Sequence, residues 1–277
     1  MIPPTSIDGT DITGATIDGT DVQEITVDGQ TVFTAGPPAA PVDRMYVAVG
    51  GGDVIQYDLD SKFSLSGTIT QTASFNIGNA TDVSLGNSGN RLYVASYSGD
   101  EIQQYDLTSA YDISNRSFAG SYSLGGAHGV TVSLDGTEAV LNSYRNFYDY
   151  GSLTTPYDIS SFSRISTSHP FSGDEGEPDY VNDGQFLIAG DDDTGVEFTE
   201  LSTPYDMTTA GTVDSATFFS LERAVHMSDD GSKLFVCDFF NDTINEFNLS
   251  TNYDITSAGS VVNSFNVGSN INGVIFV

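Results

Sequence analysis

The stretch of sequence that decides the fold reads Asp230-Gly231-Ser232-Lys233-Leu234-Phe235-Val236-Cys237-Asp238 and leads, after a second short segment, into Tyr253-Asp254-Ile255. It combines a tight turn, a strand and an aromatic–polar–aliphatic triplet. The turn glycine recurs as Gly89, Gly136, Gly184 and Gly231, at intervals of 47, 48 and 47 residues. The triplet recurs as Phe63-Ser64-Leu65, Tyr111-Asp112-Ile113, Tyr157-Asp158-Ile159, Tyr205-Asp206-Met207 and Tyr253-Asp254-Ile255. A fixed period of this length indicates a repeat architecture.

Each copy contains four short strands and no window with helical periodicity. In the second copy these strands are Leu92–Ser96, Glu101–Leu107, Ser117–Leu124 and His128–Ser133. Four strands in a repeat of about 47 residues are typical of a β-propeller blade. We therefore predict an all-β fold built from four-stranded blades.

The two ends of the repeat region predict how the ring closes. The first copy begins at its second strand, Met45–Val49, because nothing upstream resembles an innermost strand. The chain ends with Gly273–Val277, which matches the innermost strand Gly129–Ser133 of another copy. The C-terminal strand can therefore complete the first blade and remove the exposed strand edges. This predicts a five-bladed propeller over residues 44–277.

Residues 1–35 carry a shorter repeat, in which Asp8-Gly9, Asp18-Gly19 and Asp28-Gly29 follow one another at ten-residue steps. Asp-Gly favours tight turns because Gly tolerates positive φ and Asp bonds to its own backbone, so this segment is predicted to be a β-rich arm. Residues 36–43, with three prolines, are predicted to be a stiff linker. The arm has too few apolar residues for a core of its own. We expect other copies of the arm or a partner protein to order it.

The charge of the chain is strongly acidic. Its 277 residues include 38 Asp and Glu against 8 Lys and Arg, which gives a net charge of −30. This balance disfavours nucleic acid and anionic membranes as partners, because phosphate binding needs Lys and Arg. An acidic, lysine-poor surface is typical of proteins from high-salt organisms, where self-repulsion is screened within roughly 3 Å. Regular strand periodicity and 11% aromatic residues argue against disorder.

The N-terminal residues lack the features of a targeting segment. The start Met1-Ile2-Pro3-Pro4 has no basic region followed by an apolar stretch, so we predict no signal peptide and synthesis in the cytoplasm. No apolar run approaches the roughly 18 residues of a membrane span, so no membrane insertion is expected. Four Asn-x-Ser/Thr triplets, among them Asn79-Ala80-Thr81, are interpreted as chance matches in a chain rich in Ser, Thr and Asn.

The repeat unit resembles a known propeller repeat. Leu201-Ser202-Thr203-Pro204-Tyr205-Asp206-Met207, with Asp230–Val236, is similar to the repeat LSTPxDI…DGxKLYV of tailed-virus and environmental microbial proteins, which is related to YVTN-type blades. The arm, with Gly14–Thr20 and Val27–Phe33, resembles N-terminal segments of structural proteins of haloarchaeal tailed viruses. The resemblance implies a virion surface protein, as a capsid turret or decoration, a tail fibre or a spike.

The same resemblance implies the partners. The arm would bind other virion proteins, and the chain would form a homo-oligomer, a trimer or a pentamer. The propeller would attach the particle to a host cell-surface glycan or an S-layer glycoprotein. A purely architectural decoration protein remains an alternative, and it would bind no ligand.

One face of the predicted propeller varies between copies. The loops that enter the innermost strands share this face with the loops between second and third strands, and the Asp-Gly turns lie on the other face. Aromatic rings can stack on the apolar faces of sugars while neighbouring polar groups bond the hydroxyls. We therefore expect glycan binding, with a plain solvated rim as the alternative, at Tyr97, His128, Tyr144, Arg145, Phe147, Asp191, Asp192, Asp193, Arg223, Phe239 and Phe240.

An enzyme is the second alternative. A glycoside hydrolase or lyase would need two carboxylates roughly 5–9.5 Å apart across the axis, and Asp82 and Glu177 are the pair that the repeat places there. The repeats carry no acid common to every blade at this position, and the chain has no Trp for sugar stacking. We therefore expect a non-enzymatic protein without catalytic residues.

Metal sites and cysteine chemistry have weak signals. Asp191–Asp193 and the acids Asp174, Glu175 and Glu177 have the hard oxygen ligands that Ca²⁺ prefers, but no EF-hand spacing, so we expect solvation and no cofactor. His128, His169 and His226 lack zinc-type spacing. The single Cys237 excludes an internal disulfide and replaces Ala95 and Ala189 of other copies. Cys237 is predicted to be a small buried residue. His226 is predicted to be a structural residue of an innermost strand, with its polar groups hydrogen-bonded.

Overall fold

The computed structural model describes residues 43–277 except 145–146, 168–169, 172–175 and 192–193, and four short strands within residues 1–42. The side chains of residues 1–42, Phe147 and Asp191 are also outside the description. The chain divides into two units, Met1–Val42 and Asp43–Val277. No helix of the described residues is long and apolar enough to cross a membrane.

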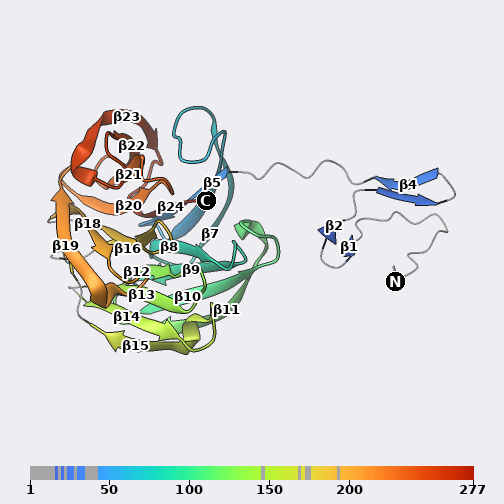
Figure 1. Ribbon diagram of the computed structural model, residues 1–277, viewed down its shortest axis with the longest axis horizontal. Coiled ribbons are helices and arrows are strands. Elements are labelled where there is room, and N and C mark those ends of the chain that lie inside the picture. The colour runs from blue at the N-terminus through green and yellow to red at the C-terminus, as the bar shows by residue number, and fades with distance from the viewer. Residues whose placement is uncertain are drawn as a thin grey trace. The chain divides into compact units, whose positions relative to one another are not determined.

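Within the described residues of the second unit, five antiparallel four-stranded sheets form the blades of a propeller (Figure 1). Blade 1 consists of β24 (Ile271–Phe276), β5 (Asp43–Val49), β6 (Asp53–Leu59) and β7 (Ile69–Asn76), from the axis outward. Blade 2 consists of β8 (Ala80–Gly86), β9 (Arg91–Ser96), β10 (Glu101–Leu107) and β11 (Arg116–Ser123). Blade 3 consists of β12 (Ala127–Val132), β13 (Glu138–Ser143), β14 (Phe147–Leu153) and β15 (Phe162–Ser166). Blade 4 consists of β16 (Glu177–Val181), β17 (Phe186–Asp191), β18 (Gly195–Leu201) and β19 (Ala210–Ala216), and blade 5 of β20 (Glu222–Met227), β21 (Lys233–Asp238), β22 (Thr243–Leu249) and β23 (Ala258–Asn266).

Burial falls from the axis outward, and this explains the composition of the strands. Every residue of the inner strand β12 is buried. In the third strand β10, buried and partly buried side chains largely alternate, as expected where the pleat directs successive residues to opposite faces. The outermost strand β23 is largely exposed. The apolar second strands and the polar fourth strands of the sequence repeat therefore follow from their distance to the axis.

The ring closes as predicted, with the C-terminal strand in blade 1. In β24, Val274 pairs with Val47 of β5, and Figure 1 shows the C-terminus beside β5. The amide of Arg44 donates to the carbonyl oxygen of Val277 at 3.1 Å, and the reverse bond measures 2.9 Å. One buried apolar cluster joins Met45 of blade 1 to Phe235 of blade 5. Closure therefore rests on both strand pairing and apolar burial.

Four of the five aromatic–polar–aliphatic triplets lead into short 3₁₀ turns, although the sequence shows no helical periodicity, and Phe63-Ser64-Leu65 does not. The turns are η1 (Ile113–Asn115), η2 (Ile159–Ser161), η3 (Met207–Thr209) and η4 (Ile255–Ser257). The Asp before each turn accepts a hydrogen bond from the amide two residues on, as Asp158 does from Ser160 at 3.0 Å. The ring of Tyr157 covers Gly136, and a Cβ added to Gly136 would lie 2.4 Å from this ring. The repeated residues of this face are therefore turn and packing residues.

The same type of hydrogen bond recurs at three joints between blades. The side-chain oxygen of Gln56 accepts from the amide of Ile113 at 3.0 Å. Gln104 accepts from the amide of Ile159 at 2.7 Å. At the closing joint, between blades 5 and 1, Glu246 accepts from the amide of Leu65 at 2.9 Å. The third-strand side chain of one blade thus holds the triplet of the next.

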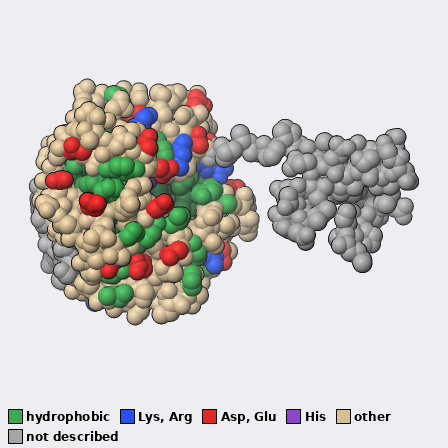
Figure 2. Space-filling model, viewed as in Figure 1, with side chains coloured by type: hydrophobic (Ala, Val, Ile, Leu, Met, Phe, Trp, Pro, Cys, Tyr) green, Lys and Arg blue, Asp and Glu red, His purple; other side chains and the backbone are tan. Residues whose placement is uncertain are grey.

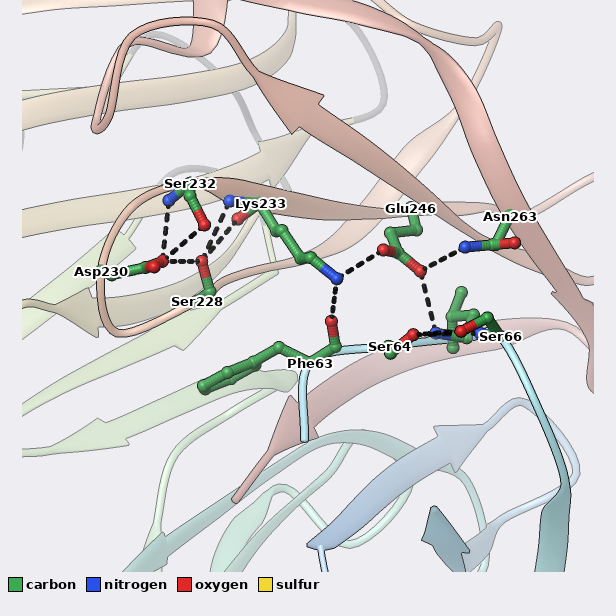
Figure 3. A network of polar contacts seen from close by, with 10 residues as sticks. Phe63, Ser64, Ser66, Ser228, Asp230, Ser232, Lys233, Glu246 and Asn263 are labelled. Carbon is green, nitrogen blue, oxygen red and sulfur yellow. Dashed lines mark hydrogen bonds and ion pairs between the residues drawn. The ribbon is translucent and has the colours of Figure 1, made fainter. Parts of the chain in front are cut away.

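The closing joint also contains an ion pair. Lys233 Nζ lies 2.8 Å from Glu246 Oε1 and donates to the carbonyl oxygen of Phe63 at 2.7 Å (Figure 3). Asn263 donates to the other carboxylate oxygen of Glu246 at 3.0 Å. Burial opposes ionisation of Glu246, but the bonds from Lys233, the Leu65 amide and Asn263 outweigh it and lower the pKa of this carboxyl. At the closing joint the accepting side chain is therefore a carboxylate paired with Lys233, where the other two joints have a glutamine.

Two paired strand segments occupy the first unit. β1 (Thr16–Ile17) pairs with β2 (Thr20–Asp21), and β3 (Glu24–Val27) pairs with β4 (Gln30–Thr34). These strands flank Asp18-Gly19 and Asp28-Gly29, so two of the three predicted hairpins are present. The third, at Asp8-Gly9, lies outside the described residues.

Two predictions for single residues have definite outcomes. The side chain of Cys237 is fully buried in the cluster that closes the ring, as predicted. His226 lies in the inner strand β20, also as predicted. Its Nδ1 bonds to Asp179, but its buried Nε2 has no partner among the described residues. The prediction that its polar groups are bonded therefore holds for Nδ1 and fails for Nε2 within the described residues.

Candidate functional site

The two faces of the propeller have different loops. The turns between second and third strands, such as Gly50–Gly52 between β5 and β6, lie on one face, which we call the upper face. The Asp-Gly turns and the 3₁₀ turns lie on the opposite, lower face. Asp43, the first residue of β5, is at the lower end of blade 1, because β5 runs from it to the upper turn.

The upper end of the axis is concave. A hollow of about 250 Å³ adjoins a second one of about 390 Å³, and both are lined by Asn79, Arg223 and Asn272. We call the two together the upper hollow. Its further lining residues are Gly50, Gly51, Thr81, Tyr97, His128, Tyr144, Phe239, Ser269 and Asn270. Five of the predicted binding residues therefore meet here, although they come from three blades.

Three aromatic rings form one wall of the upper hollow. Tyr97 lies edge-on to His128 at 5.4 Å and to Tyr144 at 5.7 Å between ring centroids. The amide of Tyr97 donates to Asn79 at 3.2 Å, and that of Tyr144 donates to Gly126 at 2.7 Å, so main-chain bonds fix both loops. Tyr97 and Tyr144 are about one-third exposed, whereas His128 is buried. The tyrosines can therefore contact a ligand, and the histidine supports them.

The opposite wall combines a cation with two rings. The guanidinium of Arg223 lies 4.4 Å from the centroid of the Phe239 ring, within the range of a cation–π contact. Phe240 is 69% exposed and lies 6.2 Å from Phe239. Asp238 holds this loop, because its carboxylate accepts from the amides of Phe240 and Asn241 at 3.1 and 3.2 Å. Phe239 lines the hollow, whereas Phe240 beside it is exposed to solvent and is not among the lining residues.

Amide side chains line the hollow between the two walls. Asn272 donates to the carbonyl oxygen of Ala80 at 3.0 Å, and its buried Oδ1 has no partner among the described residues. Asn79 and Asn270 were missed in the sequence, where Asn79 is conspicuous only as part of a chance triplet. The signal that would have found them is their position, since each directly precedes an innermost strand. None of the described lining residues is Asp or Glu, in contrast to the acidic chain as a whole.

The remaining predicted residues lie outside the description. Arg145, Asp192 and Asp193 are not described, nor are the side chains of Phe147 and Asp191. The same applies to Asp174 and Glu175 of the predicted Ca²⁺ ligands. Among the residues whose placement is described, no group of three or more His, Cys, Asp or Glu side chains could hold a metal ion.

The two axial acids line a narrow section of the axis below the upper hollow. Asp82 accepts from its neighbour's amide, Val83, at 2.7 Å and from the amide of Val130 in blade 3 at 2.8 Å. Burial raises the pKa of this carboxyl well above its ordinary value. Glu177 is also buried, with 4% of its surface exposed. Asp82 therefore links blades 2 and 3.

Comparisons with known proteins agree on the fold. No family model matches the chain, and no curated protein matches it. Among solved structures, a candidate 6-phosphogluconolactonase from Bacteroides fragilis is 14% identical, with a TM-score of 0.51 over 91% of this chain and 72% of that one. The periplasmic gluconolactonase of Pseudomonas aeruginosa is 15% identical, with a TM-score of 0.50 over 85% and 70% of the two chains. At this identity the likeness shows the β-propeller fold and assigns no activity to this chain.

Proposed function

We propose that this protein is a non-enzymatic recognition protein of a halophilic virus particle, and that its upper hollow binds a sugar of the host cell surface. The observation that carries the proposal is the composition of the upper hollow. Exposed tyrosine rings face a guanidinium and a phenylalanine, with amide side chains between them.

This chemistry suits a sugar. The rings of Tyr97, Tyr144 and Phe239 offer apolar surface for the C–H face of a sugar ring, while Asn79 and Asn272 offer donors and acceptors for its hydroxyls. One of the two hollows, at about 390 Å³, lies within the roughly 300–1,000 Å³ of small-molecule sites. A hollow without described carboxylates also avoids repelling an acidic sugar.

The viral setting of the proposal rests on the sequence. The repeat and the arm resemble structural proteins of haloarchaeal tailed viruses, and the net charge of −30 suits molar salt. In the proposed particle, residues 1–42 bind other virion proteins and the chain is a trimer or pentamer. Asp43, the first residue of the second unit, lies on the lower face of the propeller, and the upper hollow lies on the opposite face.

The test is binding of the labelled full-length protein to haloarchaeal cells in molar salt. Wild type should bind saturably, and the variant Tyr97→Ala/Tyr144→Ala should bind at least tenfold more weakly. Phe118→Ala is the matched control, because this ring is 61% exposed on the outer strand β11, away from the hollow. Cells whose surface sugars have been oxidised by periodate should lose the signal.

Two results would sink the proposal. One is the absence of saturable binding by folded wild type, which would favour an architectural decoration protein whose deletion weakens particles. The other is an equal loss in Phe118→Ala, which would indicate general hydrophobic adhesion.

An enzyme is the second candidate, because Asp82 and Glu177 line the same narrow section of the axis. If wild type cleaves a surface glycan and both Asp82→Asn and Glu177→Gln abolish turnover while the fold persists, a glycan-active enzyme replaces the recognition protein. Turnover is measured as release of reducing ends from isolated cell-surface glycan.

A further inference from the structure

A second hollow lies at the other end of the axis, on the lower face. It measures about 460 Å³, and we call it the lower hollow. The five inner strands meet there, and one position on four of them contributes a polar side chain: Ser84, Thr131, Asp179 and His226. The corresponding residue of β24 is Ile275. The lower hollow therefore has a built polar floor, which the turn and packing residues around it do not require.

The polar floor has a defined hydrogen-bonding pattern. His226 Nδ1 lies 2.8 Å from Asp179 Oδ2. An ionised carboxylate only accepts, so the hydrogen lies on Nδ1, and the neutral ring then carries a lone pair on Nε2. This Nε2 is buried and has no partner among the described residues. The His226 side chain is only 9% exposed, packed with Phe63 and Phe276 at 5.9 and 5.6 Å between centroids. Its rotation is thus restricted.

Acceptors predominate over donors on this floor. An ionised Asp179 can only accept, the Nε2 of a neutral His226 ring accepts, and the hydroxyls of Ser84 and Thr131 can accept as well as donate. Thr131 Oγ1 lies 3.5 Å from Asp179 Oδ1, so the hydroxyl and the carboxylate face the same space. A ligand with several N–H donors on one atom would satisfy these groups together.

The walls of the lower hollow favour a cation. Asp183 and Asp229 add carboxylates, Tyr111 and Tyr205 add aromatic rings, and no Lys or Arg is among the described lining residues. Lys62 lies near the rim, but it is paired with Asp229 at 2.9 Å. Arg44, which bonds to the carbonyl oxygen of Tyr111, is paired with Asp58. Carboxylates and aromatic faces together are the surroundings that ammonium groups prefer.

We propose that the lower hollow binds a small organic ammonium ion, whose N–H groups bond to Asp179, to His226 Nε2 and to Thr131. This site is independent of the proposed function, since it lies on the opposite face and needs neither the upper hollow nor the arm. The ligand proposed here is a cation, whereas the ligand proposed for the upper hollow is a sugar.

The test is calorimetric titration of the full-length protein with putrescine at about pH 8.5, where alkylammonium groups stay charged. Salt is kept near molar, so that loose attraction to the acidic surface is screened within roughly 3 Å. Putrescine should bind saturably with one ion per chain, whereas butane-1,4-diol, which has the same length and no charge, should not bind.

Variants locate the site. Asp179→Asn keeps the shape of the side chain and should weaken putrescine binding at least tenfold. Thr131→Val, which removes a single hydroxyl without changing size, should weaken it a few fold and serves if Asp179→Asn misfolds. Asp214→Asn is the matched control, because it removes the same charge from the exposed outer strand β19. The proposal would be overturned if the heat of putrescine titration into folded wild type did not saturate, or if Asp179→Asn and Asp214→Asn weakened binding equally.

Discussion

The ion pair at the closing joint should stabilise the propeller more than any exposed pair, and a double-mutant cycle can measure it. The side chain of Glu246 is 2% exposed and that of Lys233 is 29% exposed. Removing one partner of a buried pair costs about 3–5 kcal/mol. Because water reaches the Lys233 ammonium, we expect Lys233→Met to lower the free energy of unfolding by about 2–3 kcal/mol.

The variant Glu246→Gln should cost less. A glutamine oxygen can still accept from the Leu65 amide, as Gln56 and Gln104 do at two other joints. What is lost is a charged hydrogen bond, about 1–2 kcal/mol after the Lys233 ammonium turns toward solvent. The double variant leaves no buried unpaired charge, so it should resemble Glu246→Gln alone. The coupling energy then equals the cost of Lys233→Met in magnitude, about 2–3 kcal/mol.

Urea unfolding followed by far-UV circular dichroism provides the free energies, at one fixed salt concentration. Lys62→Met is the control, because Lys62 and Asp229 form an exposed pair, with side chains 38% and 78% exposed, and such pairs contribute about 0–1 kcal/mol. If the two single variants add without coupling, or if Lys62→Met costs as much as Lys233→Met, the charge at the closing joint does not stabilise the ring (Figure 3).

Two further predictions concern the same framework. Gly136→Ala should lower the free energy of unfolding by at least about 2 kcal/mol, because Gly136 has φ +72° and the added Cβ would lie 2.4 Å from the Tyr157 ring. Gly125→Ala is the control in the same urea assay, since a Cβ added there has no atom within 4 Å. Equal urea midpoints for the two variants would contradict the reasoning. The lowered pKa of Glu246 stabilises the fold above the unfolded value of about 4.3, and this is lost as pH falls through the folded pKa. The stability difference between wild type and Glu246→Gln should therefore shrink below about pH 4.3, and a constant difference down to acid unfolding would refute the assignment.

The fold was predictable because its determinants are local and repeated. Turn glycines at a fixed interval and apolar second strands specify one blade, and the unmatched inner strand at Gly273–Val277 specifies where the ring closes. The closing ion pair was not predictable in the same way. Lys233 and Glu246 stand in the sequence like any exposed pair of charges, because the blade 1 residues that they contact, Phe63 and Leu65, are distant in the sequence, Leu65 by 181 residues from Glu246.

The candidate site was predictable in part. Tyr97, Tyr144 and Phe239 stand out as aromatic residues in variable loops, and these loops converge because every blade presents the same end to one face. The amides were harder to find, because Asn is common in turns for conformational reasons. The lower hollow was missed because Ser84, Thr131, Asp179 and His226 differ in every blade. A residue that changes from copy to copy within an inner strand shows no repeat pattern. Its hydrogen-bond partner also lies in the next blade, as Asp179 does for His226.

The charge difference between the two ends of the axis gives the two proposed sites different salt dependence. On the face drawn in Figure 2, red carboxylates lie among green hydrophobic side chains and blue cations are few. The upper hollow has no carboxylate among its described lining residues, so binding of a neutral sugar there should persist as salt rises and the acidic surfaces of protein and cell cease to repel. Ammonium binding in the lower hollow depends on Asp179, Asp183 and Asp229, and it should weaken over the same range. Titrations of both ligands between about 0.1 M and molar salt, where the screening length falls from about 10 Å to about 3 Å, compare the two directly. Parallel salt curves would mean that both signals report the overall charge of the chain and neither reports a site.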